Sequence, residues 1–277
     1  MPAFRYVVTD VFTDVPLAGN QLAVFTDARE IPEEMLQLLA REINFSETVF
    51  VYPANSEGHV RIRIFTPALE LPFAGHPVLG TAFVLAGPLQ LEEIRLETGA
   101  GVVPVRLRRD GSRIAFGWMR QPAFSHEPYE GADELLALLG VGESGLPVEA
   151  YLQGPGHVLV ELDSPEAVAA LRPDIGALLE LSPFGTMCFA RDGATWKVRV
   201  FVPAHGVDED PATGSAAGPL ALHLARHGRI AFGEEIEIRQ GGEIGRPSTL
   251  FAVAHSEDEV DVGGSAVAVA RGEFHLP

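Results

Sequence analysis

Three ionisable residues of this 277-residue chain stand where they could move protons. Glu47 lies between an aromatic residue and an apolar segment, in the sequence Asn-Phe-Ser-Glu-Thr-Val-Phe. A carboxyl group that loses hydration in such surroundings has a raised pKa, which suits general acid–base catalysis. His76 stands at the start of a predicted helix, where the helix dipole favours the neutral imidazole. Asp210 precedes a proline that keeps its backbone extended, as a fixed carboxylate in a loop requires.

Each of these side chains also has a purely structural interpretation. Glu47 could lie at a strand edge in solvent, His76 could cap or pack, and Asp210 could belong to an ordinary acidic surface loop. If the three share one site, the chemistry they support is removal of a proton from carbon and its later return.

Two glycine-containing turns could bind an anion. Gly75 stands in Phe-Ala-Gly-His-Pro, and Gly214 and Ser215 close the turn Asp-Pro-Ala-Thr-Gly-Ser. The first amides of a helix have no intrahelical partner and carry partial positive charge, and small residues let a ligand approach them. A carboxylate or an enolate-like oxygen would suit such a site. Capping of the second helix by Thr213 or Ser215 is the alternative interpretation.

The two turns belong to a unit that occurs twice. The segment that begins at Phe65 is repeated in the segment that begins at Phe201, at offsets of 136 and then 139 residues. The matching residues are Phe65, Pro67, Ala68, Pro72, Gly75, Ala82, Leu85 and Ala86 with Phe201, Pro203, Ala204, Pro211, Gly214, Ala221, Leu224 and Ala225. Two copies of so long a unit predict two related lobes rather than a solenoid. His76 and Ser215 occupy equivalent positions, so the two turns present different polar groups.

The elements that would position these turns are many strands and a few helices. Apolar periodicity predicts a helix over 33–43. Pro77 is placed to open a second helix, which Gly87-Pro88 would stop. Pro219 cannot lie deep in a helix, which puts the start of the helix after the second turn near Ser215. The mixture predicts an α+β fold.

The domain boundary is expected in a polar stretch that contains proline and glycine, from Arg120 to Gly131. This divides the chain into an N-terminal lobe, residues 1–120, and a C-terminal lobe, residues 121–264. The C-terminal segment 265–277 could join the first lobe.

Composition excludes several classes of protein. The net charge of −18 disfavours nucleic acid or an anionic membrane as a partner. The chain begins without the pattern of a signal peptide, and no apolar run reaches the ~18 residues of a membrane helix, so we expect a cytoplasmic protein. The one cysteine, Cys188, lies in an apolar segment and is expected to be buried and inert. A mechanism with two cysteines is therefore excluded.

His223 and His227 are four residues apart on a predicted helix, a spacing that could bring both to one metal ion. The segment His-Leu-Ala-Arg-His lacks the glutamate of the HExxH motif, and no obvious third ligand is near it in sequence. We therefore expect a solvent-facing pair and no metal site. The chain also has no GxGxxG, P-loop or GxSxG motif.

Four motifs together resemble the phenazine-biosynthesis PhzF family, and the resemblance covers essentially the whole chain. The motifs are Gly19-Asn20, Asn44-Phe-Ser-Glu-Thr-Val-Phe50, Glu70-Leu-Pro-Phe-Ala-Gly-His-Pro77 and Asp208-Glu-Asp-Pro-Ala-Thr-Gly-Ser-Ala216. The resemblance implies the diaminopimelate-epimerase fold, with two pseudo-symmetric lobes and the site in the cleft. Each lobe would have a central helix wrapped by a curved, mainly antiparallel sheet. The related epimerases and proline racemases use one cysteine per lobe, which this chain lacks at both turns.

The resemblance also implies a role for each candidate residue. Glu47 would be the acid–base residue, and His76 and Asp210 would help to bind and orient the substrate. A small carboxylate-bearing substrate would be bound by Asn20, Gly75, Gly214 and Ser215. The implied activity is an isomerisation without cofactor, of the type that converts trans-2,3-dihydro-3-hydroxyanthranilate, carried out by a homodimer.

Two other functions stay open from the residues alone. A non-catalytic binding protein for small molecules would keep the cleft but would have no need of Glu47. A racemase of a small amino acid would use Glu47 and Asp210 as bases on opposite faces of the substrate, and exchange of the α-proton with solvent deuterium would reveal it.

Overall fold

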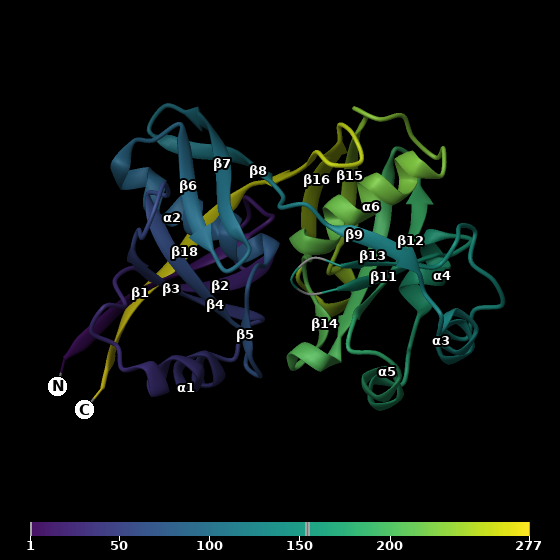
Figure 1. Ribbon diagram of the computed structural model, residues 1–277, viewed down its shortest axis with the longest axis horizontal. Helices are drawn as coiled ribbons and strands as arrows, with labels where there is room; N and C mark the ends of the chain where they lie inside the picture. The colour runs from purple at the N-terminus through teal and green to yellow at the C-terminus, as the bar shows by residue number, and fades with distance from the viewer. Residues whose placement is uncertain (1, 153, 155, 277) are drawn as a thin grey trace.

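The computed structural model describes residues 2–152, 154 and 156–276, and Figure 1 displays two groups of elements side by side. Most of the first 120 residues form the first group. Its elements are β1 (Ala3–Val11), β2 (Asn20–Phe25), α1 (Glu33–Ile43), β3 (Glu47–Pro53), β4 (Val60–Phe65), β5 (Glu70–Leu71), α2 (Gly75–Leu89), β6 (Glu93–Thr98), β7 (Gly101–Asp110) and β8 (Arg113–Arg120).

The second group follows in sequence, and the last strand returns to the first group. Its elements are β9 (Ser125–Pro128), α3 (Ala132–Leu139), β10 (Glu149–Leu152), β11 (His157–Glu161), α4 (Pro165–Ala170), α5 (Ile175–Leu181), β12 (Gly185–Asp192), β13 (Thr195–Val202), β14 (Val207–Asp210), α6 (Gly214–Arg226), β15 (Glu235–Gln240), β16 (Ser248–Ala254) and β17 (Val260–Gly264), with β18 (Ala266–His275) as the returning strand. Short 3-10 helices cover Pro203–His205 and Gly242–Ile244.

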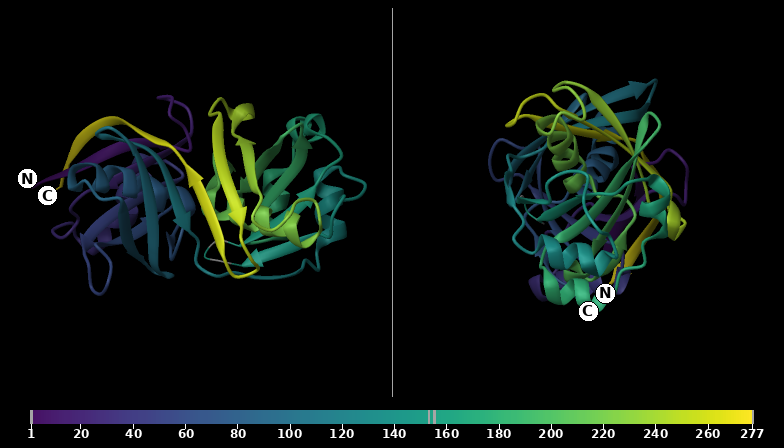
Figure 2. Two further views of the ribbon diagram at one scale, coloured as in Figure 1. Left: turned by 90° about the horizontal axis from the view of Figure 1, so that it is seen from above. Right: turned by 90° about the vertical axis from the view of Figure 1, so that its right-hand side faces the viewer.

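The chain crosses between the groups twice. After β8 it enters the second group, where β9 pairs with β10, and after β17 it returns so that β18 pairs with β1. Figure 2 shows the C-terminal strand leaving one group to lie along the other. Because β8 and β17 also pair with each other, the described strands join in one large mixed sheet that runs through both groups.

The strand pairings of the two groups correspond. In the first group β2 is parallel to β3, β3 antiparallel to β4, and β4 parallel to β6. In the second, β11 is parallel to β12, β12 antiparallel to β13, and β13 parallel to β15. Phe65 lies opposite Thr48, and Phe201 lies opposite Thr186. The residues that the sequence repeat relates thus occupy equivalent places in the sheet.

One long helix packs inside each group. α2 contacts β1, β2, β6 and β8, and α6 contacts β15, β16 and β17. Both helices are apolar on most sides, as a helix surrounded by a sheet must be, and α6 is buried from Gly214 to Ala225. The two helices begin at the same place: a β-carbon added at Gly75 would lie 2.5 Å from the carbonyl carbon of Gly214. The sheet therefore brings the two predicted turns face to face.

The predicted elements differ from the observed ones in two places. The helix over 33–43 is confirmed as α1. α2 is not stopped by Gly87-Pro88 and ends at Leu89, because a proline removes a single helical hydrogen bond and Gln90 then ends the helix in a left-handed conformation. α6 begins at Gly214, which confirms the predicted start near Ser215, but Pro219 lies inside the helix, where the missing amide leaves only the carbonyl of Ser215 without its helical donor.

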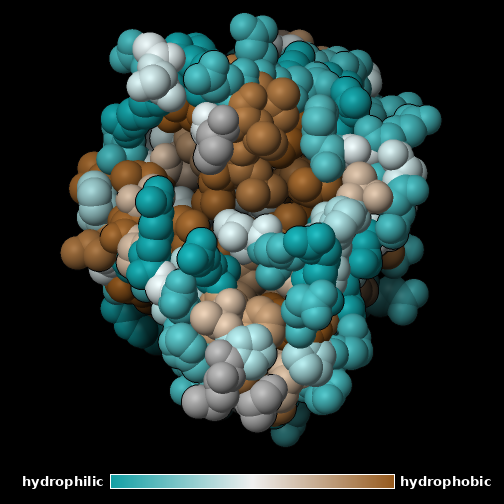
Figure 3. Space-filling model, turned by 90° about the vertical axis from the view of Figure 1, so that its left-hand side faces the viewer, coloured by the Kyte–Doolittle hydropathy of each residue, from teal (hydrophilic) through white to brown (hydrophobic). Residues whose placement is uncertain are grey.

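The outer face of the first group carries an apolar area. Figure 3 shows it hollowed and bordered by hydrophilic residues. Beside the end of α2 a cavity of about 250 Å³ is lined by Phe83 and Val84 of α2, Ile114 of β8, and Val267 and Ala268 of β18. Among the described residues, β18 pairs with β1 alone, so its other edge is open.

In the described ranges no helix is long and apolar enough to cross a membrane.

Candidate active site

The three predicted ionisable residues lie together where α2 and α6 begin. Glu47 is the first residue of β3, His76 the second of α2, and Asp210 the last of β14. The side chains of Glu47 and His76 are only 14% and 3% exposed, and Asp210 is buried. The tertiary structure thus excludes the interpretations of Glu47 as a solvent-exposed strand edge and of Asp210 as part of a surface loop.

Asn20, the first residue of β2, joins the two groups at this point. Its Nδ2 atom lies 2.8 Å from Oδ1 of Asp210, 3.0 Å from the carbonyl oxygen of Ala212 and 3.2 Å from Nδ1 of His76. A carboxylate and a carbonyl can only accept, so the amide must turn its NH₂ toward them. The NH₂ group directs its two protons to Asp210 and Ala212, and Nδ1 of His76 lies beside it as a third neighbour.

Nε2 of His76 faces Glu47 at 3.3 Å from Oε2, and neither atom makes a hydrogen bond within the described part of the chain. Burial lowers the pKa of His76 to about 3, so its imidazole is neutral at ordinary pH. Burial, and then the charge of Asp210, hold the pKa of Glu47 well above its usual value. A carboxyl group with a raised pKa is a better acceptor of a proton from carbon.

Asp210 is a carboxylate with many donors. Oδ2 accepts a hydrogen bond from the hydroxyl of Thr213 at 2.6 Å, and Oδ1 accepts from Asn20 and from the hydroxyl of Ser46 at 3.0 Å. Burial raises the pKa of Asp210, but these three hydrogen bonds oppose the rise. Of the two carboxyl groups, Glu47 without hydrogen bonds at Oε2 is therefore the one that takes a proton first.

Neither helix start is capped by the side chain of its own N-cap residue. Neither Ala74 nor Thr213, the two N-cap residues, accepts a hydrogen bond with its side chain from the first turn. The hydroxyl of Thr213 donates to Asp210, and Ser215 Oγ lies 3.0 Å from Nε2 of His157. The capping interpretation is therefore wrong for Thr213 and Ser215, and two uncapped helix starts meet at the site.

Sequence reasoning missed His157 and Gln240. His157 begins β11 as Asn20 begins β2, so Asn20 beside His76 corresponds to His157 beside Ser215. The repeat was the signal that could have found it. Gln240 accepts from the amide of Thr213 and donates to the carbonyl oxygen of Asp210, which fixes the second turn. Nothing near Gln240 in the sequence indicates this, because it lies 27 residues beyond the turn.

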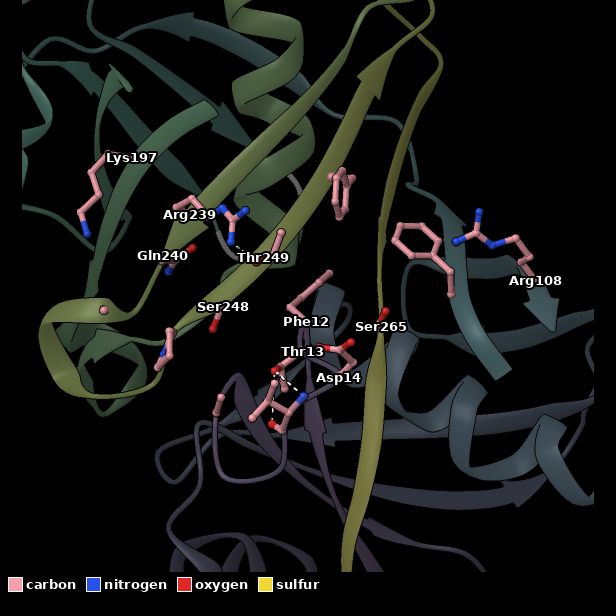
Figure 4. A pocket seen from close by; sticks show the side chains of 16 residues that line it. Phe12, Thr13, Asp14, Arg108, Lys197, Arg239, Gln240, Ser248, Thr249 and Ser265 are labelled. Carbon is pink, nitrogen blue, oxygen red and sulfur yellow. Dashed lines mark hydrogen bonds between the residues drawn. The ribbon is translucent and has the colours of Figure 1, made fainter. Parts of the chain in front are cut away.

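A groove of about 630 Å³ lies next to this site. Figure 4 shows Phe12, Thr13 and Asp14 between Ser248 on one side and Ser265 on the other. None of the predicted site residues lines it. The ring of Phe12, which lies 2.9 Å from the place of a β-carbon on Gly214, separates the groove from the helix starts.

Two predictions concerned residues away from the site. Cys188 is buried, and burial raises the pKa of its thiol to about 12, which fits an inert residue. The prediction of a solvent-facing pair at His223 and His227 is wrong for His223, which has no exposed surface. His223 faces β10 instead of solvent, and there the carboxylate of Glu149 lies 3.1 Å from its Nδ1 atom.

Comparison with known proteins shows relatives along almost the whole chain. Residues 9–272 match the family described as phenazine biosynthesis-like protein, PhzC-PhzF. The trans-2,3-dihydro-3-hydroxyanthranilate isomerase of Pseudomonas aeruginosa is 48% identical over 98% of this chain and 99% of its own length. The isomerase of the same name from Pseudomonas fluorescens is 47% identical with the same coverage.

Solved structures extend the similarity to the fold. The crystal structure of a Bacillus anthracis phenazine biosynthesis protein of the PhzF family matches all of this chain with a TM-score of 0.85 at 26% identity. A hydroxyproline epimerase from Agrobacterium vitis matches 99% of the chain and is itself covered to 91%, with a TM-score of 0.67 at 12% identity, which shows a shared fold alone. With this mixed α/β fold and these relatives, the chain belongs to the PhzF family of phenazine biosynthesis-like isomerases.

Proposed function

We propose that this isomerase moves a proton between two carbons of a small unsaturated carboxylate without a cofactor, and that trans-2,3-dihydro-3-hydroxyanthranilate is its substrate. The names of the relatives at 48% and 47% identity support the substrate. The observation that carries the mechanism is the buried Oε2 of Glu47, without a hydrogen bond and 3.3 Å from a neutral imidazole. An oxygen in that setting is free to take a proton from carbon.

Glu47 acts twice in the proposed reaction. In its ionised form it removes a proton from a carbon next to an unsaturated group. The raised pKa of Glu47 favours this transfer, and Nε2–H of His76 can stabilise the ionised form before it reacts. The protonated Glu47 then returns the proton to another carbon of the substrate, which shifts a double bond. One base that works on one face suits such a shift.

The charge that develops on the substrate would be stabilised by the two helix starts. The uncapped amides around Gly75 and Gly214, with the hydroxyl of Ser215, are oriented before the reaction and need no reorganisation. Asn20 and Asp210 would keep His76 in the tautomer that faces Glu47. Because a β-carbon does not fit between Gly75 and Gly214, a substrate can enter only when the two helix starts separate.

A racemase with Glu47 and Asp210 as its two bases is less well supported. Both oxygens of Asp210 already accept hydrogen bonds, from Thr213 at one and from Asn20 and Ser46 at the other. These three donors oppose the rise in the pKa of Asp210, whereas Oε2 of Glu47 has no hydrogen bond within the described residues, so Asp210 is the weaker base of the two. Asp210 is therefore better suited to positioning than to proton abstraction.

The test is solvent-deuterium incorporation followed by NMR in D₂O, with trans-2,3-dihydro-3-hydroxyanthranilate as the substrate. The wild-type chain is expected to form product, with deuterium at the reprotonated carbon to the extent that the proton on Glu47 exchanges with solvent before its return. Glu47→Gln is expected to form no product while it keeps its fold. Glu42→Gln is the matched control, because Glu42 is an exposed glutamate on α1. Product formation by Glu47→Gln at the wild-type rate would contradict the assignment of the base.

We also propose that the two groups of elements are lobes produced by duplication. The first would comprise residues 1–120 with the C-terminal segment 265–277, and the second residues 121–264. The equivalent strand pairings and the antiparallel pairing of β18 with β1 support this division. Each lobe would then be a curved, mainly antiparallel sheet around its own helix, α2 or α6.

A second copy of the chain is the proposed protein partner. The open edge of β18 and the apolar cavity beside α2 support a homodimer, since an open strand edge next to apolar surface invites pairing. Light scattering is expected to give the mass of two chains, and Ala268→Asp, at an exposed position of β18, is expected to give the mass of one. A wild-type mass of one chain would contradict the proposal.

A further inference from the structure

A second polar cluster lies at the opposite end of α6 from Ser215. Two histidines, His223 and His227, stand one helical turn apart near the end of α6, and Glu149 and Tyr151 face them from β10. Residues four apart lie on one face of a helix, so both imidazoles reach the same place. The third ligand that the sequence lacked near the histidines is Glu149, which lies 74 residues from His223 in the chain.

The groups of this cluster converge on a single oxygen. Oε2 of Glu149 lies 3.1 Å from Nδ1 of His223, 3.3 Å from Nε2 of His227 and 3.1 Å from the hydroxyl of Tyr151. Nη1 of Arg226 lies 2.6 Å from the same oxygen. A carboxylate oxygen has two lone pairs in its plane and so accepts about two good hydrogen bonds. Four polar neighbours are therefore more than hydrogen bonding to this oxygen explains.

The spacing of the three candidate ligands suits a small divalent cation. Their ligand atoms all lie within 4.8 Å of one another, and two of the separations are 3.1 and 3.3 Å. With zinc–ligand distances near 2.0–2.1 Å, the atoms of a tetrahedral site are about 3.3 Å apart. Two imidazoles and one carboxylate also form a familiar donor set for zinc, with the fourth position open to water.

Arg226 is the group that a metal must displace. Nη1 of its guanidinium donates to Oε2 of Glu149 at 2.6 Å and lies 2.8 Å from the hydroxyl of Tyr151. The side chain of Arg226 is 18% exposed and that of His227 is 21% exposed, so the cluster opens to solvent on the side of these two residues. The guanidinium can turn outward along this path, and a cation can enter by it.

We propose that Glu149, His223 and His227 form a binding site for Zn²⁺, in which the metal takes the place of the Arg226 guanidinium at Oε2 of Glu149. The metal would join the end of α6 to β10 within one half of the molecule. Because this end of the helix lies away from Glu47 and His76, the site is separate from the proton-transfer reaction.

The experiment is a calorimetric titration of the chelator-treated full chain with Zn²⁺, repeated with Co²⁺ while the visible absorption is recorded. The wild-type chain is expected to bind one equivalent, and Co²⁺ is expected to develop the absorption bands of a four- or five-coordinate ion. His227→Ala is expected to lower the affinity roughly tenfold or more and to abolish those bands. Arg226→Met is expected to raise the affinity, because the competing cation is gone.

His255→Gln is the matched control. His255 also has a carboxylate partner, Asp261, with Nε2 and Oδ2 3.2 Å apart, but it lies outside the cluster. The control is expected to bind the metal like the wild type. The proposal is overturned if the wild type binds no Zn²⁺, if His227→Ala binds it equally well, or if His255→Gln loses it to the same extent. Turnover of His227→Ala, measured alongside, is expected to equal that of the wild type and confirms that the variant is folded.

Discussion

Nε2 of His76 lies 3.3 Å from Oε2 of Glu47, and neither atom makes a hydrogen bond within the described residues. In the proposed tautomer of His76 the proton lies on Nε2, and this N–H stabilises the carboxylate of Glu47 more than its carboxylic acid. Burial has the opposite effect and favours the acid, so the net result is a raised pKa of Glu47. A raised pKa suits a residue that takes a proton and later returns it.

The rate should depend on pH through Glu47. Because its pKa is held well above 4.5, kcat/KM is expected to rise with pH along a single ionisation that lies well above that value. His76 should add no ionisation near neutral pH, since its pKa is lowered to about 3. A pH–rate profile of the wild type is the measurement. A profile that is already flat just above pH 4.5 would contradict this prediction.

The stability of Glu47→Gln should depend on pH in a defined direction. The folded pKa of Glu47 is above its unfolded value, so its contribution to folding is fully present below about pH 4.5 and is lost as pH rises through the folded pKa. Glutamine does not ionise and avoids that loss. The variant is expected to be more stable than the wild type near neutral pH, with the difference vanishing at low pH. Thermal denaturation over a pH series measures it, and an equal difference at all pH values is the contrary result.

Gly75→Ala should prevent the two helix starts from meeting. Its β-carbon would lie 2.5 Å from the carbonyl carbon of Gly214 and 2.6 Å from the amide nitrogen of Ser215, so the backbone must move apart. A shift of about 1 Å at a reaction centre can cost roughly a hundredfold in rate, and we expect a loss of that order in kcat/KM. Gly87→Ala is the control on the same helix, because a β-carbon there meets nothing within 4 Å. Steady-state kinetics of both variants would decide, and equal losses would refute the argument.

Asn20→Ala should weaken both the fold and the reaction. It removes one of the three donors of Asp210 and the side-chain donor of the buried carbonyl oxygen of Ala212, which is expected to cost about 1–3 kcal/mol in the free energy of unfolding. Turnover should fall further, because the tautomer of His76 is no longer fixed. Asn55→Ala is the control, since Asn55 is exposed and uses its backbone amide to donate to Glu97. Denaturant unfolding and turnover are measured on both, and an unchanged Asn20→Ala would contradict the assigned role.

Much of the site could be predicted from the sequence because its signals are local. The small residues before α2 and α6 and the apolar segment after Glu47 can each be recognised within a few neighbouring residues. The repeat between the segments at Phe65 and Phe201 further predicted that the two turns are equivalent. Equivalent strand registers, Thr48 with Phe65 and Thr186 with Phe201, agree with that expectation.

The partners of these residues could not be predicted in the same way. Asn20 donates to Asp210 across 190 residues, so this contact depends on how the two groups of elements meet. His157 meets Ser215 across 58 residues, and this contact depends on how β11 lies beside the start of α6. The same is true of His223, whose surroundings became polar and buried only because Glu149 packs against it from β10. The sequence by itself determined which residues could do chemistry, through their types and their immediate neighbours. The tertiary structure alone decided which of them meet, because burial and hydrogen bonding between distant segments arise only when the chain is folded.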